Sequence, residues 1–440
     1  MNKSRIRTIL ALGLPIIGGM LSQNILNLVD TAMVGQLGDI SLAAVGTGSF
    51  VNFMAVSFVT GLSAGVQAIS SRRKGEGRLE VMAEPLNGAM VIAIAFAIPV
   101  SAILIWWSYP LFSLVNSDPV VSSVGGGYLQ IRLFAMVAVG MNFAFRGYWN
   151  GIHQPKLYLR TLVIMHICNI ALNWLLIFGM LGLPAMGAFG AGLGTTIATF
   201  IGTGYYFYLG RKHALENGFL HGMPNKKAFG TILRLAVPNG IQQLFFSGGF
   251  TMLFWILGKV GTDTAAAATV LVNIMLVAIL PAIALGMSAA SLVGSALGRG
   301  DGEDAMQWGW DVVKVAIVLL MVLGLPMWAF PELILSIFIN DPETIVLARV
   351  PLILVGTTIW LDGMGLVLLN ALLGAGDSRR AMVISIGLQW GLFLPLAYLI
   401  GPVLGFGLLG IWMAQIGYRG LQAGVFALQW RVGKWRSISV

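Results

Sequence analysis

Polar and acidic side chains recur on one face of an otherwise apolar segment near the start of the chain. The segment QNILNLVDTAMVG, residues 23–35, places Gln23, Asn27 and Asp30 at positions i, i+4 and i+7, which lie on one face of a helix. A carboxylate near the centre of a membrane-spanning helix costs about 2.5–3.5 kcal/mol on insertion scales. Asp30 must therefore face the protein interior or a water-filled cavity. It is either a structural acid that pairs with another helix or a proton or cation site, and we favour the second interpretation.

A second polar stripe lies in HICNIALNWLLIFG, residues 166–179, where His166, Asn169 and Asn173 follow i, i+3, i+7. Buried amides can hydrogen-bond a carboxylate and change its pKa, or they can simply hold helices together. We expect the two asparagines to join Asp30 in a coupling site, whereas the role of His166 stays open. The next segment, MGAFGAGLGTTIAT, allows close helix contact through its glycines and offers the hydroxyls of Thr195 and Thr196.

The second half of the chain has an intramembrane acid of its own. Asp362 falls in the middle of TTIWLDGMGLVLLN, residues 357–370, and an unpaired charge there is costly. We expect Asp30 and Asp362 to be the main ionisable residues in mid-span. A further polar stripe, expected on the helix near residue 240, consists of Asn239, Gln242, Gln243 and Ser247.

Candidate substrate contacts and a candidate hinge complete the functional set. Thioethers repack around varied ligands, so Met33 could line an adaptable pocket, although core packing explains a mid-span methionine as well. Pro15 removes a backbone donor and favours a kink four turns before Asp30; that kink is either a hinge or static. The residues that we expect to contact substrate are Gln23, Asn27, Met33, Thr195, Thr196, Gln243 and Asp362.

The composition requires a membrane protein. Of 440 residues, 57% are hydrophobic and only 10% are charged, against about 25% charged in an average soluble protein. The apolar runs are too long for barrel strands, so they predict an all-α integral membrane fold. We expect twelve helices, at about 8–34, 45–71, 85–110, 121–148, 157–180, 187–210, 229–258, 266–297, 306–330, 344–371, 379–401 and 405–430.

The positive charge marks one side of the membrane and does not indicate a nucleic-acid partner. The net charge is +9, but the basic residues lie in short loops between apolar runs, as in the segment SRRKGEGR, residues 71–78. Loops on the opposite side carry mainly acids such as Asp118 and Asp341. By the positive-inside rule, both termini are expected to be cytoplasmic, in a multi-pass protein of the inner (plasma) membrane. Cys168 is the single cysteine, so no intramolecular disulfide is expected.

The two halves of the chain look duplicated. GLPIIGGMLSQNILNLVDTAMVGQLG (13–38) is similar to AVPNGIQQLFFSGGFTMLFWILGKVG (236–261), and one constant offset pairs Pro15 with Pro238 and Asp118 with Asp341. We therefore expect an N-terminal lobe, 1–215, and a C-terminal lobe, 216–440, each with six helices. Parallel repeats of this kind are typical of secondary transporters with a site between the halves. The alternative is an old duplication without alternating access, as in a channel or a membrane enzyme.

Several kinds of chemistry lack their motifs. The sequence contains no HExxH, no Walker A loop and no ATPase domain. Its four histidines and one cysteine are scattered, so we expect neither a metal site nor an enzyme. Transport would then be driven by an ion gradient or run downhill.

The chain resembles the multidrug and toxic compound extrusion (MATE) family over essentially its full length. The resemblance rests on an ordered set of segments and not on one diagnostic string. These segments are NLVDTAMVGQLG (27–38), GLSAGVQAISSRRKGEG (61–77), NIALNWLLIFG (169–179), GAFGAGLGTTIA (187–198), GMSAASLVGSALGRGDGEDA (286–305) and LLGAGDSRRAM (372–382).

The resemblance implies two pseudo-symmetric six-helix lobes in a V shape that export cationic or amphiphilic drugs by antiport. It implies that Asp30 is the coupling acid and that Asn169 and Asn173 surround it. Some relatives have an acid at the second asparagine position, which helps to bind sodium; Asn173 weakens such a site here. In the NorM-like branch two acids form a C-lobe cation site, of which Asp362 matches one, while the other is replaced at or near Ser247. These departures favour proton coupling and the DinF-like branch.

The implied partners are small cationic drugs or dyes, which would connect the protein with antibiotic resistance, together with membrane lipids. We expect a monomer without cofactors, with H⁺ as the coupling ion and Na⁺ as the alternative. Two further alternatives are a flippase for lipid-linked sugars and a membrane-embedded enzyme. A flippase of this kind would carry a strongly cationic cavity, which two mid-span acids do not favour.

Overall fold

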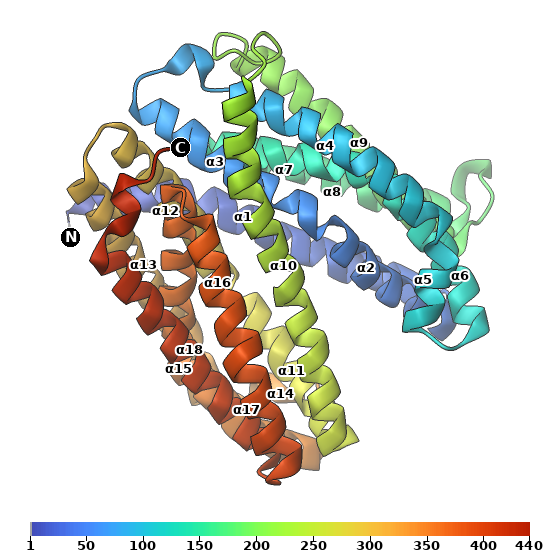
Figure 1. Cartoon of the computed structure of the whole chain (residues 1–440). Helices are drawn as coiled ribbons and strands as arrows, with labels where there is room; N and C mark the ends of the chain where they lie inside the picture. Colours follow the sequence, from blue (N-terminus) through green and yellow to red (C-terminus); the bar gives the residue numbers. More distant parts are fainter. Residues whose placement is uncertain (1) are drawn as a thin grey trace. The chain divides into compact units, whose positions relative to one another are not determined.

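Every regular element that the computed structural model describes, over residues 2–440, is a helix (Figure 1). The chain divides into two compact units. One, here the N unit, is Gly18–Ile241; the other, the C unit, contains the chain up to Ile17 together with Gln242–Val440. Two long helices, α1 (Lys3–Gly35) and α10 (Lys226–Val260), contribute residues to both units.

The N unit contains most of α1 and the helices up to the first half of α10. Its helices are α2 (Asp39–Thr60), α3 (Leu62–Gly75), η1 (Leu79–Val81), α4 (Glu84–Trp106), α5 (Ser108–Val115), α6 (Pro119–Leu133), α7 (Met136–Gly151), α8 (Pro155–Phe178), η2 (Met180–Gly182) and α9 (Gly187–His213). Helix α8 packs against α9, α3 against α7, and α2 against α6. Residues 18–35 of α1 and the whole of α8 belong to this unit.

The C unit is built around α15. Its further helices are α11 (Thr262–Ala278), α12 (Leu280–Gly298), α13 (Gly302–Ala329), α14 (Pro331–Ser336), α15 (Pro342–Ala375), α16 (Ser378–Leu388), η3 (Gln389–Phe393), α17 (Leu394–Tyr398), η4 (Leu399–Val403), α18 (Gly407–Val432) and η5 (Lys434–Ser437). Helices α12, α13 and α18 all pack on α15. A cluster of buried apolar side chains that includes Leu271, Leu320 and Trp412 forms the core.

Nine helical segments within residues 2–440 are long and apolar enough to cross a membrane. They are Lys3–Gly35, Asp39–Gly75, Leu79–Trp106, Pro155–Phe178, Lys226–Val260, Thr262–Gly298, Gly302–Ala329, Pro342–Ala375 and Ser378–Val403. The pair α6 and α7 would add a tenth span, bent by 50°. Helices α9 and α18 occupy the two other predicted spans; α9 is rich in glycine and threonine and α18 carries buried Gln415, Arg419 and Gln422, which lowers their hydropathy.

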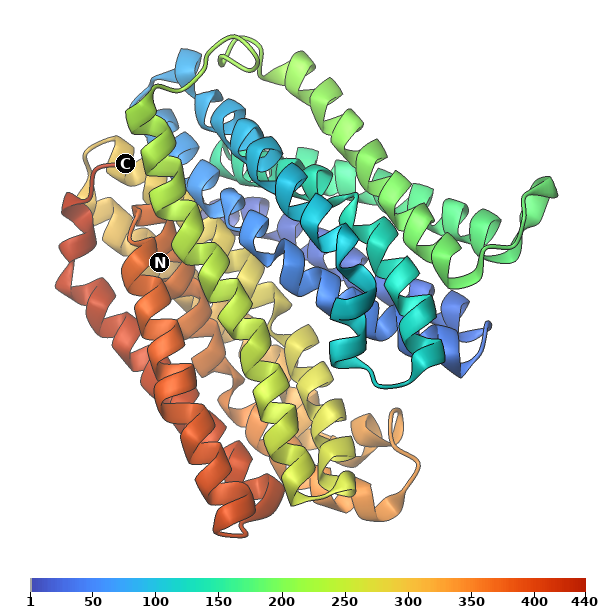
Figure 2. The ribbon, with the colours of Figure 1, turned by 45° about the vertical axis from the view of Figure 1, so that its right-hand side comes forward.

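The internal repeat predicted from the sequence appears in the elements. The first residues of α1 and α10 are separated by the same number of positions as the first residues of α8 and α16, and this offset also pairs Pro15 with Pro238. Both α1 and α10 continue without a break through their prolines, and Figure 2 shows α10 as a single long helix. Asp118 and Asp341, which the same offset pairs, both cap the following helix by accepting backbone N–H bonds.

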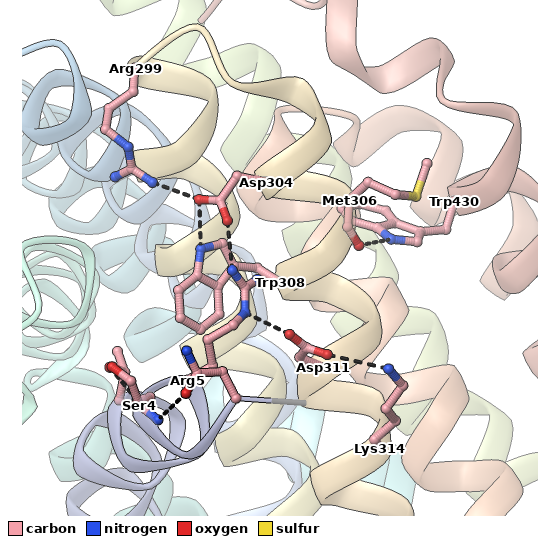
Figure 3. A network of polar contacts seen from close by, with 11 residues as sticks. Ser4, Arg5, Arg299, Asp304, Met306, Trp308, Asp311, Lys314 and Trp430 are labelled. Atoms are coloured by element: carbon pink, nitrogen blue, oxygen red, sulfur yellow. Dashed lines mark hydrogen bonds and ion pairs between the residues drawn. The ribbon is translucent and has the colours of Figure 1, made fainter.

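The first turn of α1 is fixed to α13 by a network of charges within the C unit (Figure 3). Arg5 donates from Nε to Asp311 Oδ2 at 2.6 Å and from Nη1 to Asp304 Oδ1 at 2.7 Å. Its guanidinium lies 3.7 Å from the ring centroid of Trp308. Lys314 pairs with Asp311 at 3.3 Å, at i, i+3 on α13. The network joins the start of α1 to α13 within the C unit.

Candidate functional site

The polar faces of α1 and α8 meet within the N unit. Asn173 donates from Nδ2 to Asp30 Oδ1 at 2.8 Å, and the same Nδ2 also donates to Asn169 Oδ1 at 2.9 Å. Both asparagines are buried, at 1% and 0% exposure, whereas Asp30 is partly exposed. The predicted trio of Asp30, Asn169 and Asn173 is thus one connected group.

A second pair of contacts extends the group along the same two helices. Gln23 Oε1 lies 3.1 Å from Nε2 of His166, and Gln23 Nε2 donates to Asn27 Oδ1 at 3.2 Å. The residues Gln23, Asn27, Asp30, His166, Asn169 and Asn173 are called here the α1–α8 polar cluster. His166, whose role the sequence left open, belongs to this cluster and contacts the stripe that carries Asp30.

The packing of α9 on α8 shapes the cluster. A Cβ at Gly194 would lie 2.2 Å from Asn173 Oδ1, so only glycine leaves room for the observed amide position. Asn173 Oδ1 itself is buried and has no hydrogen-bond partner among residues 2–440. One acceptor thus remains available next to the carboxylate.

The remaining candidates of the N unit have partners outside this cluster. Thr195 donates to Ala191 O at 2.9 Å, and Thr196 donates to Ile131 O at 3.0 Å. Met33 packs against a cluster of buried apolar side chains formed by Val34, Tyr128, Ile177 and Ala191. These contacts give each residue a structural role, and substrate contact stays a prediction for all three.

Asp362 has a basic partner that the sequence interpretation missed. Its Oδ1 lies 3.1 Å from Nε of Arg419, and the two side chains are only 10% and 9% exposed. The prediction that Asp30 and Asp362 are the main ionisable residues in mid-span is therefore wrong, because Arg419 is buried in α18. A signal was present in the sequence: Gln415, Arg419 and Gln422 follow i, i+4, i+7, the spacing that identified Asp30.

Asp30 differs from Asp362 in its surroundings. Among residues 2–440, the ion pairs of the structure do not include Asp30. Its hydrogen-bond partner is the neutral amide of Asn173, and Arg132 acts on its charge from a longer distance without forming an ion pair. An acid held by a neutral amide can change its charge without breaking a salt bridge. Chemically, the α1–α8 polar cluster is therefore suited to bind and release a proton or a small cation, whereas Asp362 is neutralised by Arg419.

No group of three or more His, Cys, Asp or Glu side chains in the described part of the chain could hold a metal ion. Gln243 is partly buried, and its neighbour Gln242 makes a hydrogen bond to Ser385 at 3.3 Å.

Pro15 lies inside α1, just before the point at which α1 passes from the C unit to the N unit. Its role as a hinge stays a prediction.

Comparison with known proteins identifies relatives over nearly the whole chain. A family model described as MatE matches residues 15–175 and 238–399, two segments that begin at the paired prolines of the repeat, Pro15 and Pro238. The chain is 25% identical to the "Probable multidrug resistance protein NorM" of Rhizobium meliloti (strain 1021), covering 97% of this chain and 92% of that protein. It is 23% identical to the protein of the same name from Thermotoga maritima, covering 99% and 94%.

Solved structures show the same fold. An outward-facing multidrug resistance MATE family transporter of the MOP superfamily superposes with a TM-score of 0.90 at 20% identity, covering 99% of this chain and 97% of that chain. A MATE structure in the straight conformation gives a TM-score of 0.90 at 20% identity, covering 97% and 96%. The predicted fold class, twelve membrane helices in two six-helix lobes, is thereby confirmed.

Proposed function

The chain belongs to the MatE family, and we propose that it exports cationic or amphiphilic compounds from the cell in exchange for protons. Its relatives and structural neighbours are transporters, as expected for a chain that is not an enzyme. The proposal places the protein in the inner membrane as a monomer, surrounded by lipid, with both termini in the cytoplasm.

The observation that carries the proposal is the contact between Asp30 and the buried amides of Asn173 and Asn169. Ionised, Asp30 accepts from Asn173 Nδ2 and supplies negative charge for a cationic substrate. Protonated, it becomes a hydrogen-bond donor, which Asn173 Nδ2 cannot accept but the unpartnered Asn173 Oδ1 can. Uptake of a proton therefore removes the charge that holds the substrate and rearranges the hydrogen bonds between α1 and α8.

Proton coupling is favoured over sodium coupling by the donor set. Sodium is a hard cation that prefers several oxygen ligands, and the cluster offers a single carboxylate as its charged ligand. Asn173 directs an N–H, and not an oxygen, at that carboxylate. A site that presents a donor to Asp30 suits a carboxylate that alternates between charged and neutral forms.

The decisive test is transport of the cationic dye ethidium by purified protein in proteoliposomes with an imposed pH gradient. We expect proton-driven export by the wild type and its loss in Asp30→Asn, which keeps the side-chain shape but cannot titrate. Asp39→Asn, an exposed position in the first turn of α2, is the matched control and should transport normally.

Three results would overturn the proposal. Unchanged, pH-dependent export by Asp30→Asn would remove the coupling role of this acid. Export that is driven by a sodium gradient and does not depend on a pH gradient would establish the sodium alternative. Transfer of a lipid-linked sugar across the bilayer, without dye export, would establish a flippase.

A further inference from the structure

The buried ion pair between α15 and α18 has one member that faces a cavity. A pocket in the C unit is lined by Arg419 and not by Asp362, so the guanidinium is the charged wall. Arg419 is 8% exposed overall, and its Nη1 donates to Gln422 Oε1 at 3.3 Å. Of the two residues of the pair, the positively charged Arg419 therefore lines the pocket, and the negatively charged Asp362 does not.

The other walls combine amides with aromatic and aliphatic side chains. Gln242, Gln389 and Gln422 line the pocket, and Phe246 and Phe426 supply apolar surface. The cavity volume is about 40 Å³. A cavity of this volume admits a small polar group such as a carboxylate, and the rest of a larger ligand would remain outside it.

The chemistry of these walls selects an anionic oxygen group. A guanidinium has five N–H donors in a planar fork that matches a carboxylate. Among residues 2–440, Nη1 of Arg419 donates to Gln422, whereas its Nε lies 3.1 Å from Asp362 Oδ1 as an ion pair without a hydrogen bond, which leaves donors for a ligand. Asp362 cancels most of the charge of Arg419, so a bound carboxylate would be held firmly enough to orient and weakly enough to leave.

We propose that this pocket binds the carboxylate of zwitterionic or acidic amphiphilic substrates, with Arg419 as the anchor and Phe246 and Phe426 as the apolar walls. The inference rests on the proposed export function and adds to it a substrate class. The acid Asp30 in the N unit serves coupling, and the guanidinium in the C unit recognises a carboxylate.

The test is equilibrium binding of two fluorescent probes, N-dansyl-phenylalanine and its methyl ester, to the purified full-length protein in detergent. The probes share their aromatic groups and differ only in the carboxylate. A charge-assisted hydrogen bond in a buried site predicts that the acid binds about tenfold or more tightly than the ester. In the double variant Asp362→Asn/Arg419→Gln, this preference should fall to about one.

Further variants keep the test decisive. Replacing both members of a buried ion pair by neutral groups is often tolerated; where the double variant does not fold, Arg419→Lys keeps the charge, loses the planar fork and should lower the preference severalfold. Asp362→Asn alone should raise the preference, because the cation is no longer cancelled. Arg349→Gln, an exposed position on α15, is the control and should leave the preference unchanged.

Equal binding of acid and ester by the wild type, or a preference that survives in the double variant, would overturn the inference. The outcome is separable from that of the proposed function. Asp30→Asn should keep the acid-over-ester preference, since Asp30 lies in the other unit. Proton-driven ethidium export without any preference would reject the carboxylate pocket alone, and a preference without proton-driven export would reject the coupling mechanism alone.

Discussion

At the scale of single residues, the position of Asn173 depends on the absence of a side chain at Gly194. A Cβ there would lie 2.2 Å from Asn173 Oδ1, much closer than atoms approach, so Gly194→Ala must displace the amide. We expect this variant to lose most proton-driven ethidium export while it still folds, because the displaced amide no longer donates to Asp30. Dye export by proteoliposomes under a pH gradient measures the effect.

Gly204→Ala is the matched control on the same helix. A Cβ at Gly204 meets no atom within 4 Å, and alanine in a helix is favoured over glycine by about 1 kcal/mol. This variant should transport normally and melt at the same or a slightly higher temperature. Normal export by Gly194→Ala would contradict the assigned role of the Asn173 amide.

The sequence predicted the residues of the α1–α8 polar cluster, but their contacts depend on tertiary packing. Asp30, Asn169 and Asn173 could be predicted because polar groups at helical spacing in an apolar segment must face each other or a cavity. The bond between Gln23 and His166, and the need for glycine at 194, follow from how closely α8 approaches its neighbours. No periodicity encodes such a distance.

At the scale of helices, Pro15 weakens α1 where the helix changes units. An interior proline removes one backbone hydrogen bond and costs about 3 kcal/mol or more in a regular helix. Pro15→Ala should restore that bond and stiffen α1, so we expect slower export at saturating dye with an unchanged dye affinity. Stopped-flow efflux and equilibrium dye binding separate the two quantities.

Pro99→Ala is the control for this prediction, because Pro99 lies inside α4, which belongs to the N unit alone. It should leave the rate of export unchanged. A Pro15→Ala variant that exports as fast as the wild type would show that the proline is a static feature of α1.

The charge network around Arg5 is expected to stabilise the C unit. Arg5, Asp304 and Asp311 are 19%, 23% and 11% exposed, so the pairs are shielded from water. Because Arg299 and Lys314 remain as partners of the two acids, removal of Arg5 should cost about 1–3 kcal/mol, less than breaking a fully buried pair. Thermal unfolding in detergent should detect the loss in Arg5→Ala.

Arg7→Ala removes an equally basic but exposed residue of the same helix turn. It should leave the melting temperature within error of the wild type. If both variants melt alike, the network of Figure 3 contributes nothing measurable to stability.

The sequence predicts a helix boundary well where a local capping residue sets it, and poorly where tertiary contacts set it. Asp118 and Asp341 precede prolines that start helices, as capping residues do. The bend of 50° between α6 and α7 has no proline or glycine at its break, residues 134–135, so no local signal predicts it. The π-helical turns η3 and η4 interrupt the span that the sequence predicts as one regular helix, and here a local signal is present: Pro395 follows η3 closely and Pro402 lies inside η4.

At the scale of the whole molecule, duplication could be predicted from a constant offset between similar segments, and the two matches to one family model begin at the prolines that this offset pairs. The two units of the structure do not follow the duplication strictly, because α1 and α10 each contribute to both. A sequence repeat records ancestry, whereas the compact units reflect which backbone segments pack together in space. The boundary between two lobes at residue 215 was inferred from the sequence repeat, and it stays a prediction.

The orientation of the molecule in the membrane is the last prediction, and it can be tested with thiols because Cys168 is the single cysteine. In a Cys168→Ser background, we expect Ser117→Cys, before the cap of α6, to react with a membrane-impermeant maleimide in intact cells. Asn2→Cys should react only after the cells are permeabilised. The physical reason is the excess of Lys and Arg in the loops on the side of the termini, which are retained in the cytoplasm. Labelling of Asn2→Cys in intact cells would reverse the orientation and, with it, the side from which Asp30 takes up a proton for export.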